Sequence, residues 1–176
     1  VVVRELNKLS VEQLTFAPPA EGQLRVRIHA CGLCQSDVGV QTGKIPMMLP
    51  CVLGHEGAGE IESIGPGVSG WTAGDRVVLT LVSPCYRCVE CASGRPSICS
   101  GRQMTPKSFV SDSSGAAVVS FMSLGCMAEY AVVSETSLVK VGSDLQLEKA
   151  ALLSCGVVTG FGAAVNCAKV RPGSSC

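Results

Sequence analysis

The clearest element that the hydrophobic pattern predicts is a strand over residues 24–30. Every second residue in this segment is apolar, and the positions between hold two arginines and His29. This period of two is typical of a strand with one face buried and the other in water. His29 falls on the polar face, so we interpret it as a surface histidine rather than a functional one.

Other segments follow the same reasoning. Short apolar runs between turn residues predict further strands, at residues 1–4, 11–16, 73–80, 118–122, 129–133 and 138–141. Serine, threonine, proline, lysine and glycine dominate residues 103–115, which predicts a surface loop. Two later segments have helical content and spacing, at residues 146–153 and 156–169, with Cys155 at their junction. The predicted fold class is mainly β (α+β), with short helices.

Composition narrows the class of protein. The 176 residues suit one ordinary domain, or one domain with the start of another, and 47% of them are hydrophobic. The formal net charge is zero and no basic run occurs, so we expect no nucleic-acid and no membrane partner. Serines and a glutamate interrupt the most apolar region, residues 116–133, which is too polar for a membrane span.

The cysteine count points to metal chemistry. Eleven cysteines is an odd number, and several are grouped at short spacings. No signal peptide opens the chain, so metal ligands are favoured over disulfides, and we expect a reducing, cytoplasmic location.

One glycine motif is interpreted as a turn. Gly65, Gly67 and Gly70 match the GxGxxG pattern of dinucleotide-binding loops, but that motif needs a strand before it and a helix opening within it. Here Pro66 and a following strand pattern at 73–80 favour a turn between two strands.

The strongest local signal is a group of four cysteines within residues 83–101, namely Cys85, Cys88, Cys91 and Cys99. Four thiolates so close in sequence can close a tetrahedral zinc site that leaves no position for water or substrate. The residues between them are too few and too polar to form a core, so metal binding would fold this lobe. An iron–sulfur cluster and two disulfides are the alternatives.

A second group of chemistry-bearing residues is dispersed along the chain. His55 stands beside Glu56 and is followed by small residues that let other backbone approach. The pair Cys31 and Cys34 could be a redox pair, a zinc pair or two core thiols. Ser36 and Asp37 favour a metal at Cys34, since they add a hydroxyl and a carboxylate close to it, while Cys31 is interpreted as a core residue.

In four segments the chain resembles the zinc-dependent alcohol dehydrogenases of the medium-chain dehydrogenase/reductase superfamily. The segments are Cys-Gly-Leu-Cys-Gln-Ser-Asp, Gly-His-Glu-Gly-Ala-Gly, the four-cysteine lobe, and Leu-Ser-Cys-Gly-Val-Val-Thr-Gly-Phe-Gly-Ala-Ala. The resemblance implies a GroES-like, partly open β-barrel over residues 1–154, with its zinc lobe at 83–101. Residues 155–176 would be a linking helix and the start of a cofactor-binding Rossmann domain, before which the chain is truncated.

The resemblance also implies the roles of residues that lie far apart in sequence. Cys34, His55 and Cys155 would bind a catalytic zinc, in addition to the structural zinc of the lobe. Glu56 would sit close behind this ion, and Asp37 would orient His55 through its other ring nitrogen. These three ligands would leave the ion one open position for an alcohol.

The resemblance also implies roles for several further residues. Ser36 matches the first group of a proton relay, but Gly39 stands where some members have the histidine that ends it. Gln35 replaces an Arg or His that contacts the cofactor pyrophosphate, and Thr159 matches a position near the nicotinamide. The substrate pocket would be lined by three apolar residues, Leu81, Phe121 and Met122.

The implied function is hydride transfer between a small alcohol or aldehyde and NAD or NADP. The resemblance further implies a homodimer or homotetramer for the full-length enzyme. The 176-residue chain, without a Rossmann domain, is expected to bind zinc but to turn over little alcohol. Two alternatives remain open: a thiol-dependent formaldehyde dehydrogenase of the same superfamily, and a non-catalytic zinc-binding module.

Overall fold

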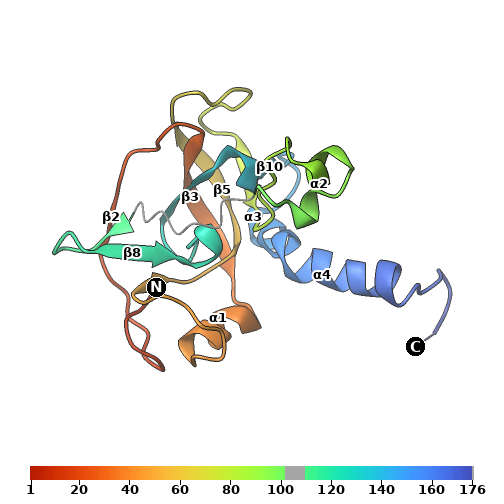
Figure 1. The fold of residues 1–176 in the computed structure, drawn as a ribbon, viewed down its shortest axis with the longest axis horizontal. Coiled ribbons are helices and arrows are strands. Elements are labelled where there is room, and N and C mark those ends of the chain that lie inside the picture. The colour runs from red at the N-terminus through yellow and green to blue at the C-terminus, as the bar shows by residue number, and fades with distance from the viewer. Residues whose placement is uncertain (102–109, 176) are drawn as a thin grey trace.

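A computed structural model describes residues 1–101 and 110–175 of the chain, and within them ten strands form two five-stranded sheets (Figure 1). The strands are β1 (Val2–Val3), β2 (Thr15–Phe16), β3 (Gln23–Gly32), β4 (Cys51–Val52), β5 (Glu56–Ile64), β6 (Arg76–Leu79), β7 (Val110–Ser111), β8 (Ala117–Ser120), β9 (Tyr130–Ser134) and β10 (Leu138–Lys140). The mainly β fold class predicted from the sequence is confirmed.

The larger sheet is antiparallel throughout, in the order β10-β6-β5-β3-β9. Its centre is the pairing of the two longest strands, β3 and β5. Leu24 and Val26 are completely buried on one face of β3, whereas Arg27 on the other face is exposed and pairs with Glu60. The strand predicted from this alternation is therefore confirmed, and it continues to Gly32.

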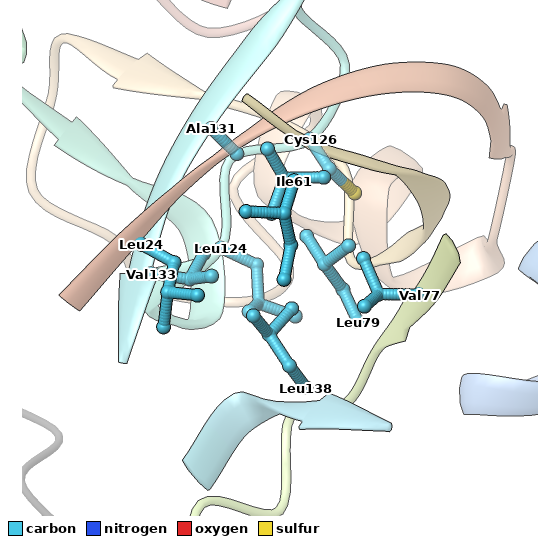
Figure 2. Close-up of a cluster of buried hydrophobic side chains, with 10 residues drawn as sticks. Leu24, Ile61, Val77, Leu79, Leu124, Cys126, Ala131, Val133 and Leu138 are labelled. Carbon is cyan, nitrogen blue, oxygen red and sulfur yellow. The ribbon is translucent and has the colours of Figure 1, made fainter. Parts of the chain in front are cut away.

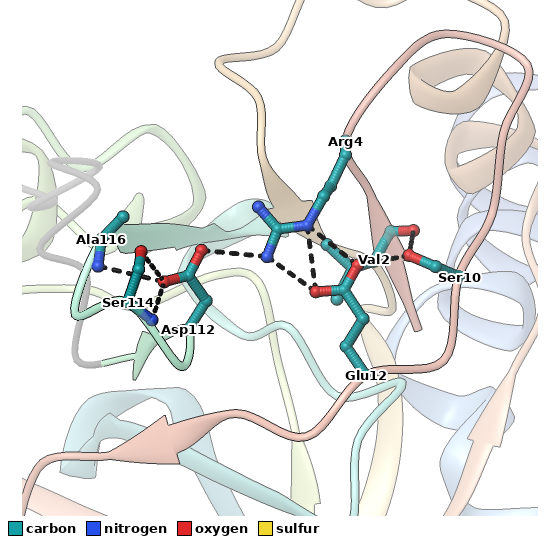
Figure 3. Close-up of polar contacts among 7 residues, drawn as sticks. All are labelled: Val2, Arg4, Ser10, Glu12, Asp112, Ser114 and Ala116. Carbon is teal, nitrogen blue, oxygen red and sulfur yellow. Dashed lines mark hydrogen bonds and ion pairs between the residues drawn. The ribbon is translucent and has the colours of Figure 1, made fainter.

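The second sheet has the order β1-β4-β8-β7-β2, and β4 and β8 pair in parallel. An ion-pair network ties the chain after β1 to the turn between β7 and β8. Arg4 lies between Glu12 and Asp112, with Nη2 at 2.7 Å and 3.0 Å from their carboxylate oxygens (Figure 3). Because Arg4 is exposed and both carboxylates are only partly buried, we assign the network a role in orientation more than in stability.

The main hydrophobic core lies against the larger sheet and draws side chains from all five of its strands (Figure 2). Its buried members are Leu24, Val26, Ile61, Val77, Leu79, Leu124, Cys126, Ala131, Val133 and Leu138. A smaller cluster, formed by Val3, Val40, Cys51, Leu53 and Phe121, fills the space between β4 and the first helix. His55, a candidate metal ligand described below, packs against Phe121 of this smaller cluster.

Helices are short in the described residues. The α-helices are α1 (Gln35–Gln41), α2 (Val89–Ala92), α3 (Leu147–Ala150) and α4 (Gly156–Gly162). The helix predicted at 146–153 is α3 followed by a 3-10 turn, η4 (Ala151–Ser154), and the one predicted at 156–169 is α4 followed by a π turn, η5 (Ala163–Cys167). The residues of α4 are exposed or half-buried, and the helix projects away from the sheets (Figure 1). The domain boundary at 154/155 stays a prediction.

Three predicted boundaries were wrong. The strand expected at 11–16 is reduced to Thr15–Phe16, and the one expected at 118–122 ends at Ser120. It ends there because Met122 and Ser123 both adopt left-handed φ angles, of 52° and 60°, which break a strand. In the predicted loop 103–115, residues up to 109 lie outside the described part, but Val110–Ser111 is a strand between β2 and β8.

The interpretation of the GxGxxG motif as a turn is confirmed. Gly65 follows β5, and after the turn the chain returns as β6, which pairs antiparallel with β5. The backbone N–H of Gly65 donates to the carbonyl of Gln23 at 2.8 Å, so this turn is attached to the start of β3. The glycines therefore serve a hairpin, and no helix opens at them.

Within residues 1–101 and 110–175, no single helix has the length and apolarity to cross a membrane. One bent pair, Leu147–Ser154 with Gly156–Cys167, meets the length and composition criteria jointly, with a bend of 51°.

We predict that Leu79→Ala destabilises the chain by about 2–5 kcal/mol, because Leu79 is completely buried in the main core and its removal leaves a cavity. Urea unfolding of the zinc-loaded chain measures the change. Leu9→Ala is the matched control: Leu9 is 54% exposed, so the same truncation should change stability by no more than about 0.5 kcal/mol. Equal effects of the two substitutions would contradict the assignment of this core.

Candidate metal centres

The described residues contain two groups of side chains that could each hold a metal ion. In each group the potential ligand atoms all lie within 4.8 Å of one another. The first group is Cys85, Cys88, Cys91 and Cys99, which we name the lobe site. The second is Cys34, His55, Glu56 and Cys155, which we name the cleft site.

The lobe site is built almost entirely by local structure. Cys88 caps the N-terminus of α2, where its Sγ accepts a hydrogen bond from the backbone N–H of Cys91 at 3.5 Å. The backbone N–H of Cys85 donates to Sγ of Cys99 at 3.3 Å. A Cβ at Gly101 would lie 2.6 Å from Sγ of Cys85, so a side chain there would displace the sulfur. Backbone amides thus point at the sulfur atoms, as they do around thiolates that bind a cation.

The pKa values at the lobe site follow from this crowding. The N–H of Cys91, as the main cause, lowers the pKa of the Cys88 thiol to about 6. Burial and the neighbouring sulfurs of Cys88 and Cys99 raise the pKa of Cys91 to about 12. Several thiolates cannot gather here without a cation to offset their charge, so this donor set fits a bound metal ion.

The cleft site brings together three segments that are far apart in sequence. Cys34 lies between β3 and α1, His55 and Glu56 lie at the start of β5, and Cys155 lies at the junction of η4 and α4. These are the ligands expected from the resemblance, together with Glu56, and the structure places their ligand atoms in one cluster.

His55 carries the best evidence that the cleft site fits a metal ion. Its side chain is completely buried, and neither ring nitrogen makes a hydrogen bond. Nδ1 lies 3.6 Å from Oδ1 of Asp37, which is too long for a hydrogen bond, and the ring packs edge-on against Phe121 at 5.4 Å. Buried polar atoms without partners are rare, and metal coordination is a standard reason for one.

Charged groups around His55 oppose the effect that burial has on its pKa. Burial by itself lowers the pKa of His55, but the carboxylate of Asp37 and the thiolate of Cys34 together raise it above its ordinary value. Burial also works against ionisation of Cys34, yet Ser36 and His55 hold the pKa of this thiol below its ordinary value. For Cys155, burial and then the negative charge of Cys34 raise the pKa to about 11. A cation among these groups would favour both thiolates.

Asp37 connects two of the ligand segments. Its buried carboxylate accepts hydrogen bonds from the backbone N–H of Gly54 at 2.9 Å and from that of Cys34 at 3.1 Å. Although burial raises it, these bonds and His55 keep the pKa of Asp37 below its ordinary value. The carboxylate is therefore ionised, and it fixes Cys34 and the residue before His55 to one point.

Ser154 connects the third segment, and our sequence reasoning missed it. The buried hydroxyl of Ser154 donates to the carbonyl of His55 at 3.3 Å and to that of Ala151 at 3.0 Å. It thus attaches the residue before Cys155 to the backbone of another ligand residue. Nothing in the sequence distinguishes a buried serine that makes these hydrogen bonds from a serine that is exposed on the surface.

The other predicted site residues differ in their burial and in the groups that they contact. The hydroxyl of Ser36 is 3.7 Å from Sγ of Cys34, and Glu56 is buried against Gly32, where a Cβ would lie 2.2 Å from Oε2. Gln35 is exposed at the start of α1, and Thr159 is exposed on α4.

The three predicted pocket residues fall into two clusters. Phe121 is buried in the smaller core beside His55, and Met122 packs against the same cluster. Leu81 instead packs against the main core. At Gly39 a Cβ would lie 2.8 Å from Cδ1 of Ile45, so Ile45 occupies the space that a side chain at 39 would need.

We predict that Asp37→Asn weakens metal binding at the cleft site by about 10–100-fold, because an amide cannot replace the charge facing His55 or accept both backbone hydrogen bonds equally. Competition with a chromophoric chelator measures affinity at each site. The lobe site of the same variant is the internal control, and its affinity should not change. Equal weakening at both sites would indicate a general loss of fold.

We also predict that chelation opens the lobe to protease. Tryptic cleavage after the exposed Arg87, between two of the cysteines, should become several-fold faster once the metal is removed, because few other contacts hold this segment. Mass spectrometry of the fragments follows the rate, with cleavage after exposed Lys44 as the control. A lobe that is equally resistant with and without chelator would contradict a metal-dependent fold.

Comparison with known proteins agrees with this arrangement. The family model of the alcohol dehydrogenase GroES-like domain matches residues 20–143. The chain is 39% identical to the alcohol dehydrogenase class-3 of Drosophila melanogaster, over 96% of this chain and 46% of that protein. It therefore spans about half the length of the curated relatives it matches.

Solved structures show the same fold. A crystal structure of an alcohol dehydrogenase zinc-binding domain protein from Burkholderia ambifaria superposes with a TM-score of 0.88 at 36% identity, covering 99% of this chain and 50% of that one. Benzyl alcohol dehydrogenase from Acinetobacter calcoaceticus gives a TM-score of 0.77 at 39% identity, covering 92% of this chain and 45% of that one. The two-sheet fold, the two clusters of potential ligands and the family match together show that the chain belongs to the family of alcohol dehydrogenase GroES-like domains, of the zinc-dependent, medium-chain type.

Proposed function

We propose that this chain is the zinc-bearing catalytic part of an oxidoreductase that transfers a hydride between a small alcohol or aldehyde and NAD(P). The observation that supports it most is the convergence of Cys34, His55 and Cys155, with both nitrogens of the buried imidazole free of hydrogen bonds. The chain's relatives are named as alcohol dehydrogenases, which agrees with this chemistry.

Two ions would bind, with different roles. The four thiolates of the lobe site would surround a structural zinc completely. At the cleft site Cys34, His55 and Cys155 would hold the second ion, with Glu56 close behind. Zinc bound there would polarise the alcohol oxygen and make its proton easier to lose.

The protein's own residues would handle the proton. The Ser36 hydroxyl lies beside Sγ of Cys34, so it can accept a hydrogen bond from an alcohol bound next to that sulfur and pass the proton outward. Since Ile45 fills the space at Gly39, the proton would pass from Ser36 to water. Asp37 would act by positioning His55 and Cys34 rather than by touching the substrate.

Different residues would contact the substrate and the cofactor. Phe121 and Met122, in the cluster beside His55, would form an apolar wall for the substrate. Gln35 and Thr159 are exposed and would be available to contact the cofactor. Leu81 remains a pocket residue by resemblance alone.

We also propose a reducing, cytoplasmic location and a homodimer or homotetramer for the complete enzyme. The location is supported by the ten cysteines that the structure describes, all of which are free thiols.

A ligand-sensitive metal probe tests the open coordination position. With Co²⁺ in place of zinc, imidazole should change the visible spectrum of the cleft site, where a position is open, and should leave the closed lobe site unaffected. Cys155→Ser should abolish the response, whereas Cys167→Ser, at an exposed cysteine outside both clusters, should preserve it. A spectrum insensitive to imidazole, or one metal ion per chain, would support the non-catalytic alternative.

Turnover tests hydride transfer itself. The 176-residue chain should oxidise little alcohol, whereas a chimaera with the unmatched half of the Burkholderia ambifaria relative should reduce NAD or NADP. A panel of alcohols, including a thiol adduct of formaldehyde, gives the substrate class, and Cys155→Ser should reduce the rate to near background. A chimaera that binds two zinc ions and nucleotide but oxidises no member of the panel would contradict the proposal.

A further inference from the structure

Two cysteines outside both metal centres lie in contact with each other. Sγ of Cys31, on β3, is 3.5 Å from Sγ of Cys126, which is in the segment before β9. Cys126 is completely buried and belongs to the main core (Figure 2), and Cys31 is partly exposed. Neither belongs to a group of potential ligands.

The fold holds these sulfurs together from both sides. Cys31 is paired in the β3–β5 ladder with Gly57, and a Cβ at Gly57 would lie 2.9 Å from Sγ of Cys126. The missing side chain at Gly57 thus leaves the space that the buried sulfur occupies. The backbone N–H of Cys126 donates to the carbonyl of Gly54 at 3.1 Å, which fixes the second cysteine to the segment before β5.

Another buried thiol shows that this contact is not a general feature of the core cysteines. Cys51 is also completely buried, but the group that its sulfur contacts is the carbonyl of Val52, at 3.5 Å. Cys31 and Cys126 are separated by 95 positions, so only the tertiary fold brings them together.

We propose that Cys31 and Cys126 form an oxidisable dithiol, which hydrogen peroxide converts into an intramolecular disulfide. Of the two residues Cys31 is the partly exposed one, so it reacts first: its thiolate attacks one peroxide oxygen, the O–O bond breaks, and hydroxide leaves and is protonated to water. The product is a sulfenic acid at Cys31.

The buried partner completes the reaction. Sγ of Cys126 attacks the sulfenic sulfur, the S–O bond breaks, and a second molecule of water leaves with the proton of the thiol. In total two thiols and one hydrogen peroxide give one disulfide and two waters, so the peroxide accepts the two electrons that the sulfurs lose. The sulfurs must approach by about 1.5 Å to reach the ~2.05 Å of a disulfide, which small side-chain rotations can supply from a starting separation of 3.5 Å.

This dithiol differs in chemistry from the neighbouring ligand Cys34. The charge of a thiolate that binds a metal ion is offset by that ion, whereas Sγ of Cys31 contacts a second thiol at 3.5 Å and the carbonyl of Gly32 at 3.4 Å. The disulfide would join β3 to the segment before β9 without consuming a metal ligand, and a dithiol reductant would reverse it.

Peptide mapping of the zinc-loaded chain tests the proposal without any substitution. After treatment with hydrogen peroxide, free thiols are alkylated under denaturing conditions and the chain is digested with trypsin. Cleavage at Arg27 and Lys44 places Cys31 on peptide 28–44, and cleavage at Lys107 and Lys140 places Cys126 on peptide 108–140. The expected product is a cross-link of these two peptides, about 2 Da lighter than their sum.

Peptide 28–44 also contains Cys34, so fragmentation between the two cysteines must assign the linked sulfur. A link from Cys31 that disappears with dithiothreitol supports the proposal. A link from Cys34 would overturn it, as would a Cys126 that is still fully alkylated when the exposed Cys167 is already oxidised.

Variants separate the two steps. In Cys126→Ala the cross-link should disappear, and dimedone should now trap the sulfenic acid at Cys31. Cys51→Ala, which removes a buried thiol with no described cysteine in contact, should leave the yield of the cross-link unchanged. Failure of dimedone to label Cys31 in Cys126→Ala, with that variant shown to be folded by its zinc content, would overturn the assignment of Cys31 as the reacting thiol.

Discussion

The buried carboxylate of Asp37 is the interaction on which the cleft site depends. It accepts the N–H groups of Cys34 and Gly54 and lies next to the ring of His55, so one side chain fixes two of the three segments that supply ligands. A buried charge with so few partners is costly unless positive charge lies near it. The arrangement is consistent with a cation on the far side of His55, where the second ring nitrogen has no hydrogen-bond partner.

The third segment, which contains Cys155, is attached by weaker interactions. Ser154 donates one neutral hydrogen bond to the carbonyl of His55, and Cys155 then lies at the junction of two short helices. Helix α4, which follows, exposes Val158 and Phe161 and packs little against the sheets. The position of Cys155 therefore depends on Ser154, and on an ion if one binds, more than the position of His55 does. The lobe site differs again, since its four sulfurs come from one short segment and are oriented by that segment's own backbone amides.

Whether a feature could be predicted from the sequence depends on how far apart in the chain its interacting residues lie. The alternation in β3 and the spacing of Cys85 to Cys99 are local signals, so the strand and the lobe could be predicted from the residues themselves. The convergence of Cys34, His55 and Cys155 could not, because residues that lie 21 and 100 positions apart share no periodicity; the resemblance to a known family supplied it. The sequence pattern did not predict strand β5, because Gly57 and Gly59 lower its strand propensity. Both glycines are nevertheless needed: Gly57 leaves space for Cys126, and Gly59 leaves space for the carbonyl of Arg27. Ser154 and the contact between Cys31 and Cys126 depend on tertiary structure alone and became visible only in three dimensions.

X-ray absorption at the zinc edge of the zinc-loaded chain tests the central claim most directly, because it counts ligands by type. Zinc–sulfur distances near 2.3 Å and zinc–nitrogen distances near 2.0 Å are well separated. A four-thiolate site together with a two-thiolate, one-imidazole site predicts two zinc ions per chain and an average of about three sulfur ligands per ion, with an imidazole contribution that is lost in His55→Ala. One zinc ion per chain with about four sulfur ligands and no imidazole would show that Cys34, His55 and Cys155 do not bind a common ion, and the assignment of a catalytic centre would be wrong.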